Sequence, residues 1–218
     1  MQRKIVISEG EYYHIYNRGV EKRNIFTSER DYQRFVRLLY LANGTRPYRY
    51  SSSKDLMLKE IDRGKPLVAI GAWVLMPNHF HLLVREIMEG GIAQLMEKLS
   101  TGYSGYFNKL HERVGSLFQG TYKAEHLDTD EYLKYMFAYV HLNPIKLIQR
   151  DWKESGIKNL QKAKQFLSTY HYSSYFDYKD IGREENLILS KDIFPEYFAN
   201  KTEFESYHQD WLDFKGDY

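Results

Sequence analysis

The chain has 218 residues, of which 43% are hydrophobic and 28% charged, with a net charge of +2 and no cysteine. This length fits one large domain, or one domain with an appended region, and the small net charge excludes a strongly basic nucleic-acid-binding protein. The lack of cysteine excludes disulfides, thiolate metal sites and cysteine nucleophiles, so any metal must be held by histidine, an amide or a carboxylate.

The first part of the chain predicts a strand, a helix and a long connection. Residues 12–17 (YYHIYN) are rich in aromatic residues and end in an Asn-Arg-Gly turn, which is typical of a strand. Ser28 then suits a helix N-cap, and apolar residues at helical spacing predict a helix to about Ala42. Residues 45–66 contain serines, prolines and glycine with little periodicity, so we expect a long connection with one short helix around residues 55–61.

A hairpin and a long helix follow. Residues 67–76 (LVAIGAWVLM) form a continuous apolar run, which indicates a strand buried on both faces. The dipeptide Pro77-Asn78 predicts a turn into a second strand over residues 79–86. Apolar residues at helical spacing over 92–110 then predict a long amphipathic helix.

The next segment predicts a fourth strand and another helix. Residues 117–127 alternate after a glycine, and the acidic segment DTDE begins a helix over about 130–142, which Asn143-Pro144 ends. The resulting order predicts an α+β fold with a ferredoxin-like βαββαβ antiparallel sheet and its helices on one face, plus a further helix. In this topology the first and third strands are the central pair.

We expect a catalytic domain over residues 1–150 and a C-terminal extension over residues 151–218, packed on it. The extension is helical and irregular, and its best helical patterns lie at 158–169 and 201–213. No segment approaches the roughly 18 apolar residues of a membrane span, and the N-terminus lacks the apolar core of a secretion signal. A cytoplasmic protein with no membrane partner is therefore expected.

Two histidines on the third strand are the first candidate site residues. His79 and His81 stand one residue apart, so they point to the same face of the strand. Imidazole is the commonest ligand for a transition metal, and a rigid strand fixes the spacing of the pair. The alternative is a polar strand edge with no metal, and two ligands alone do not make a site.

The helix after the fourth strand offers the other candidate site residues. Tyr139 and Asn143 are four residues apart and share one helical face. Asn143 can give a neutral oxygen to a metal held by the histidines. Tyr139 would then lie near anything bound to that metal, where a polarised phosphodiester makes attack by a phenol feasible. The alternative is that Tyr139 is a packed core tyrosine.

These residues lie in motifs that resemble the HUH single-tyrosine transposases, and in particular their REP-associated tyrosine transposase branch. The matching segments are YHIYNRGVEKRNIF, AWVLMPNHFHLLV, GSLFQGTYKAEHL and EYLKYMFAYVHLNPIK, within about residues 11–178. A further element, HYSSYFDY, departs from the family pattern, in which Pro-Trp precedes the serines; here His171 and Tyr172 stand there, and no role is carried onto the tail.

The resemblance implies that His79 and His81 bind a divalent metal, Mg²⁺ or Mn²⁺, with Asn143 as third ligand and Tyr139 as nucleophile. The family cleaves single-stranded DNA next to a hairpin, which leaves a 5′-phosphotyrosine and a free 3′-hydroxyl that can later rejoin strands. No nucleotide cofactor is needed, in agreement with the absence of a Walker-type loop. On ligand chemistry alone, two imidazoles suit Mn²⁺ better than Mg²⁺.

Candidate DNA contacts are basic residues near the strands: Arg18, Lys22, Arg23 and Lys123. Each of them also fits an ordinary solvated surface. The family contains dimers and proteins that act alone, so a monomer and a homodimer both remain open.

Two other functions remain open on the sequence. In a metal-dependent nuclease, the metal would activate water and Tyr139 would be structural, so activity would survive Tyr139→Phe. In a non-catalytic RNA- or DNA-binding module, exposed aromatic residues of the sheet would stack bases; the sequence lacks the usual aromatic pattern of such modules.

Overall fold

A computed structural model of the chain describes residues 5–213. The strands are β1 (Tyr12–Arg18), β2 (Val68–Met76), β3 (His79–Glu86) and β4 (Lys123–His126). The helices are α1 (Glu29–Ala42), α2 (Tyr50–Ser53), α3 (Gly91–Leu110), α4 (Asp130–Leu142), α5 (Trp152–Ser155), α6 (Leu160–Leu167) and α7 (Lys201–Asp213). Short 3-10 helices are η1 (Val20–Lys22), η2 (Leu58–Glu60), η3 (Asn143–Leu147), η4 (Ser174–Lys179), η5 (Glu184–Ile188) and η6 (Lys191–Ile193). None of the helices in this described range is long and apolar enough to cross a membrane.

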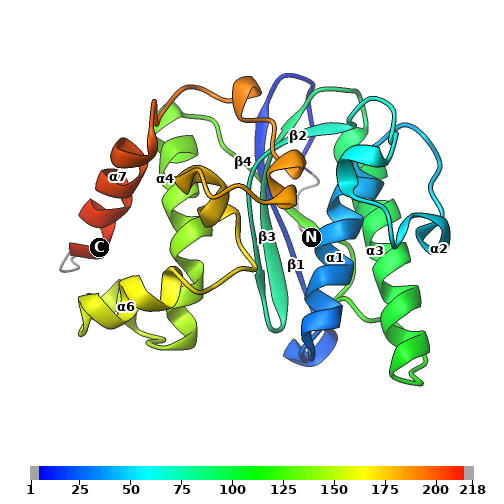
Figure 1. The fold of residues 1–218 in the computed structure, drawn as a ribbon, viewed down its shortest axis with the longest axis horizontal. Helices are drawn as coiled ribbons and strands as arrows, with labels where there is room; N and C mark the ends of the chain where they lie inside the picture. The colour runs from blue at the N-terminus through cyan, green and yellow to red at the C-terminus, as the bar shows by residue number, and fades with distance from the viewer. Residues whose placement is uncertain (1–4, 214–218) are drawn as a thin grey trace.

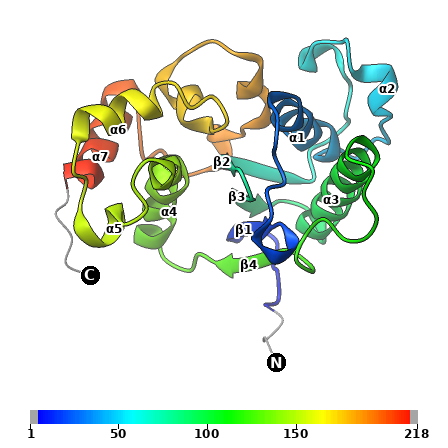
Figure 2. The ribbon, with the colours of Figure 1, turned by 90° about the horizontal axis from the view of Figure 1, so that it is seen from below.

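The four strands form one antiparallel sheet in the order β2-β3-β1-β4. With α1 and α3 as the two crossover helices, this is the ferredoxin-like arrangement predicted from the sequence, and β1 and β3 are its central pair. Seen along the sheet, α1 and α3 cover one face and α4 lies on the other (Figure 2). The predicted fold class is therefore confirmed.

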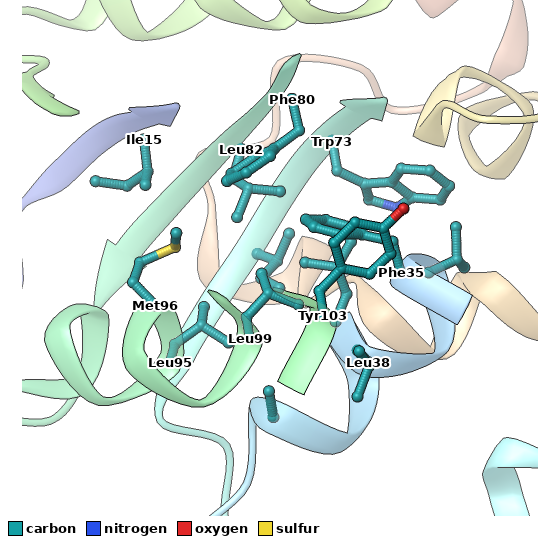
Figure 3. Packing of buried hydrophobic residues seen from close by; sticks show 14 of the residues in the cluster. Ile15, Phe35, Leu38, Trp73, Phe80, Leu82, Leu95, Met96, Leu99 and Tyr103 are labelled. Carbon is teal, nitrogen blue, oxygen red and sulfur yellow. The ribbon is translucent and has the colours of Figure 1, made fainter. Parts of the chain in front are cut away.

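The pleat of β3 divides its side chains between two cores. Phe80 and Leu82 are fully buried and point toward α1 and α3, where they pack with Phe35 and Tyr103 (Figure 3). Leu83 points the other way and belongs to the cluster under α4. The two histidines of β3 have the parity of Leu83, so the same alternation that fills the main core directs them toward α4.

The chain after residue 150 packs on α4 and along the outer edge of β2. Figure 1 shows α6 and α7 beside α4, on the side away from α1 and α3. Near β2, the amide of Leu75 donates to the carbonyl of Tyr172 over 2.9 Å, and Val74 forms a β-bridge with Ser173. This contact covers an edge that would otherwise expose unpaired backbone groups. One hydrophobic cluster joins Leu142 and Ile145 to Trp152 and Ala163, on both sides of residue 150. The division into a catalytic domain and an extension at that residue stays a prediction.

Two local expectations were wrong. The fourth strand was predicted over 117–127, but β4 covers only its last part, because Gly120 adopts a φ of +72° that breaks the extended run. Before it, Phe118 forms an isolated bridge with Gly19. The long connection holds α2 and a separate 3-10 turn rather than one helix near residues 55–61.

Candidate active site

The paired histidines lie side by side on the α4 face of the sheet. In the ladder with β1, His79 is opposite Arg18 and His81 is opposite Tyr16. The ring centroids of His79 and His81 are 4.9 Å apart and the rings are nearly perpendicular. His81 is buried and His79 is half-buried.

The hydrogen bonds of His79 determine which ring nitrogen is free. Its Nδ1 lies 2.6 Å from Oδ1 of Asn78, and the amide nitrogen of Asn78 donates to the backbone carbonyl of Lys22. This second bond orients the Asn78 amide, so its oxygen faces the ring and accepts from Nδ1–H. The lone pair of the His79 imidazole is therefore on Nε2, where it can bind a metal.

A chain of three residues orients His81 in the same way. His81 Nδ1 lies 2.8 Å from Nε2 of His14, whose Nδ1 lies 3.2 Å from the carboxylate of Glu125. The hydrogen bond from His14 lowers the pKa of Glu125, so this group is an ionised acceptor at neutral pH. With its Nδ1–H donated to this carboxylate, the tautomer of His14 that carries one ring proton accepts at Nε2, and His81 Nδ1 is then the donor. His81 is left with its lone pair on Nε2.

Burial keeps both candidate ligands uncharged. Removal from water, with the charge of the nearby Lys146 ammonium as the next cause, lowers the pKa of His79 to about 4. The pKa of His81 is well below its ordinary value, first through burial and then through His14. Neutral imidazole is the form that coordinates metals.

Asn143 begins η3, directly after α4, and is fully buried. Its amide is close enough to affect the pKa of both His79 and Tyr139, yet within residues 5–213 neither Oδ1 nor Nδ2 has a hydrogen bond of normal geometry. A buried amide without a partner costs on the order of 1–3 kcal/mol, so such a group calls for a bound water or ion.

The donor set of two imidazole nitrogens and one amide oxygen fits a divalent transition metal. Among the described residues, no group of three or more His, Cys, Asp or Glu side chains is arranged to hold a metal. A metal at the paired histidines would need a ligand of another kind beside the two imidazoles, and the buried amide of Asn143 offers an oxygen without a hydrogen-bond partner among the described residues.

Tyr139 lies over the histidines from α4. Its ring centroid is 5.3 Å from that of His81 and 5.6 Å from that of His14, in edge-on geometry. Burial raises the pKa of the phenol, while the amide of Asn143 lowers it. A cavity of about 290 Å³ opens between the sheet and α4, with all its lining residues on these two surfaces: His14, Tyr16, His81, Glu125, Tyr132, Tyr135, Met136 and Tyr139.

Of the four basic residues predicted to contact DNA, two lie on the sheet face of the histidines and two lie in the loop after β1. Arg18 is opposite His79 in the ladder, and Lys123 is opposite Tyr16, so both share the sheet face of the histidines and both are exposed. Arg18 also donates from Nε to Oε1 of Gln119 over 2.5 Å. Lys22 and Arg23 lie in the loop after β1, which contacts the turn before His79 through the bond from Asn78 to Lys22.

Several residues of the site were missed by sequence reasoning. His14 could have been found, because its parity on a predicted central strand places it on the face of the paired histidines. Glu125 follows from the register between β1 and β4, where it is opposite His14. Lys153, whose Nζ is 3.9 Å from the Tyr139 ring centroid, gave no signal, since only the path of the extension brings it there.

Comparison with known proteins found one family model and a solved structure that are similar to this chain. Residues 53–143 match the family described as "Transposase IS200 like", and no curated protein matches the chain. One solved structure, titled "Structure of the REP associates tyrosine transposase bound to a REP hairpin", is similar with a TM-score of 0.49 and 11% identity, over 100% of this chain and 92% of that one. The matched segment contains His79, His81, Tyr139 and Asn143. Over residues 53–143 the chain carries the sequence pattern of the IS200-like transposase family, which confirms the transposase resemblance indicated by its motifs.

Proposed function

We propose that this protein is a DNA transposase that cuts and rejoins single-stranded DNA through Tyr139. The observation that carries the proposal is one of proximity: Tyr139 lies over His81, and the amide of Asn143 lies close to both His79 and Tyr139. The tyrosine and the asparagine are more than 50 residues from the paired histidines in the chain. All four lie within the segment that matches a transposase family.

The chain's residues fit a divalent metal, Mg²⁺ or Mn²⁺, held by Nε2 of His79, Nε2 of His81 and Oδ1 of Asn143. When bound, such a metal neutralises charge on a phosphodiester and polarises it toward attack. The two imidazoles favour Mn²⁺ over Mg²⁺. His14 and Glu125 keep His81 in the tautomer that offers its lone pair to the cavity.

Tyr139 is the proposed nucleophile. Its Oη forms a bond to phosphorus while the bond from phosphorus to the 3′ oxygen breaks; the phenol releases its proton and the 3′ oxygen takes one up. The products are a 5′-phosphotyrosine and a free 3′-hydroxyl, and attack by that hydroxyl reverses the step. Because the phosphodiester energy is kept in the adduct, no nucleotide cofactor is required. Burial raises the pKa of the phenol further above neutrality, so nearby positive charge matters to its reactivity.

The proposed partner is single-stranded or hairpin DNA. Arg18 and Lys123 would contact phosphates on either side of the cavity, and Lys22 and Arg23 would do so from the loop after β1. The solved structure with a similar fold is of a protein bound to a hairpin. The protein acts as a monomer or a homodimer.

The test is to incubate wild type and Tyr139→Phe with labelled hairpin-containing single-stranded DNAs, with Mn²⁺ or a chelator, and to separate the products on a denaturing gel. We expect label on the wild-type protein only, and only with metal. Tyr132→Phe removes another phenol of α4 and is expected to form the adduct. Equal cutting by wild type and Tyr139→Phe, with no adduct, would instead indicate a nuclease that uses activated water.

A further inference from the structure

Two lysines from the chain after α4 lie against the proposed nucleophile. Lys146 belongs to η3 and Lys153 to α5. The Nζ of Lys153 is 3.9 Å from the ring centroid of Tyr139, and that of Lys146 is 5.6 Å from it. Both side chains are half-buried. The cavity side of Tyr139 faces the histidines, and these lysines add positive charge around the same ring.

Neither ammonium group is paired with a carboxylate of residues 5–213. Lys153 donates to Oη of Tyr135 over 3.3 Å, and neither lysine forms an ion pair with any residue in the described range. The exposed Glu154 raises the pKa of both lysines without forming an ion pair with either. Contact with an aromatic ring offsets only part of the cost of removing an ammonium group from water.

The two charges also repel each other. Burial lowers the pKa of Lys153 to about 8, and the charge of Lys146 is the next cause. Burial lowers the pKa of Lys146 as well. Two partly desolvated like charges are unfavourable in the free protein and become favourable when an anion binds between them.

Lys153 can be approached from outside. A cavity of about 70 Å³ opens on the Lys153 side of Tyr139, between α4 and the extension. It is lined by Tyr135, Ala138, Tyr139, Leu142, Trp152, Lys153 and Trp211. The nucleophile is therefore bordered by two open spaces, one over the histidines and one beside Lys153.

We propose that Lys146 and Lys153 form a phosphate clamp, which holds a DNA phosphate beside Tyr139 before cleavage and the tyrosine-linked phosphate after it. This inference rests on the proposed function, because it takes DNA as the source of the phosphate. It gives the C-terminal extension a direct part in the site, since α5 carries one of the two charges. An ammonium is well suited to this role as a point charge that contacts phosphate oxygens.

The experiment measures DNA binding without cleavage. In a Tyr139→Phe background, with chelator and no metal, the affinity for a fluorescent single-stranded oligonucleotide is measured over a range of salt. Each phosphate contact contributes a slope of about 0.7 in a plot of log affinity against log salt for single strands. Lys146→Gln and Lys153→Gln are each expected to reduce the slope by about 0.7, and the double variant by about twice that. Inorganic phosphate is expected to compete with DNA only when both lysines are present.

Lys162→Gln is the matched control. Lys162 is exposed on α6, so its substitution removes the same charge without touching the clamp, and the slope is expected to stay unchanged. A second experiment replaces the phosphates of the oligonucleotide, one at a time, by a neutral methylphosphonate. At one of these positions the replacement is expected to weaken binding to the Tyr139→Phe protein but not to the same protein with both lysines substituted. Unchanged slopes in both lysine variants, or the same loss in Lys162→Gln, would overturn the proposal.

A folding defect is separated by charge-preserving substitution. Lys153→Arg is expected to keep the slope, whereas an equal loss in Lys153→Arg and Lys153→Gln would mean that charge is not the cause and would overturn the clamp. Thermal melting checks the fold, and removal of an unpaired charge is expected to keep or raise Tm. The outcomes also separate this inference from the proposed function: adduct formation with unchanged slopes removes only the clamp, while reduced slopes without any Tyr139-dependent adduct leave a phosphate site that serves other chemistry.

Discussion

His14 Nε2 lies 2.8 Å from His81 Nδ1, so a histidine of the first strand fixes a candidate metal ligand of the third. Glu125 on β4 holds the other nitrogen of His14. The three side chains cross the sheet from its edge to its centre. With Nδ1 of His81 engaged in this way, its Nε2 is available to bind a metal. Partners of this kind raise ligand basicity and commonly change metal affinity by about 10–100-fold when removed.

His14→Ala is expected to weaken Mn²⁺ binding by about 10-fold or more, because His81 then loses the acceptor that fixes its tautomer. Isothermal titration of Mn²⁺ into the DNA-free protein measures this directly and does not depend on cleavage. His126→Ala is the control, since His126 is an exposed histidine of β4 that pairs with Glu11 away from the cavity. Equal affinity of wild type and His14→Ala would show that the relay has no influence on the metal.

Asn143→Ala is expected to separate stability from metal binding. It removes a buried amide that has no hydrogen-bond partner within residues 5–213, so Tm without metal should stay equal or rise. In wild type, Mn²⁺ at 100 times its Kd should stabilise the fold by about 2.7 kcal/mol, and most of this gain should vanish in the variant. Thermal melts with and without Mn²⁺ provide both values. A variant that keeps the full metal-induced shift would exclude Asn143 as a ligand.

DNA binding is expected to weaken as the pH rises through about 8. The pKa of Lys153 in the free protein is lowered to about 8 by burial and by Lys146. Only the charged ammonium attracts a phosphate, so its contribution is present below that pH and lost above it. Affinity of the Tyr139→Phe protein for single-stranded DNA from pH 6.5 to 9.5 tests this. Lys153→Arg stays charged throughout and should flatten the profile; an unchanged profile would assign the effect to other groups.

Ser174→Ala is expected to destabilise the protein by about 1–3 kcal/mol. The fully buried Ser174 hydroxyl accepts from the amide of Trp73 on β2 and lies 2.8 Å from Nε2 of His141 on α4. Its loss leaves these buried groups without a partner, at the point where the extension joins the sheet to the helix of Tyr139. Urea denaturation measures the effect. Ser168→Ala, an exposed serine whose hydroxyl donates to Gln165, should change stability little.

Local periodicity predicted the main elements of this protein and half of its candidate site. A period of two assigned His79 and His81 to one face of a strand, and a period of 3.6 assigned Tyr139 and Asn143 to one face of a helix. These relationships are set by neighbouring backbone geometry, so a single sequence contains them. The order of strands and helices, with the short hairpin at Pro77-Asn78, was also enough to predict the ferredoxin-like sheet.

Only the tertiary structure decided which of these faces meet. The register of β1, β3 and β4 brings His14 and Glu125 to His81. That register depends on pairing between distant segments, since His14 and His81 are more than 60 residues apart in the chain. Lys153 reaches Tyr139 because the extension folds back on α4. The missing hydrogen bonds of Asn143 likewise exist only after packing, since an amide becomes unpartnered when burial removes it from water. Sequence periodicity fixes the direction of a side chain within its element; long-range packing decides what it faces.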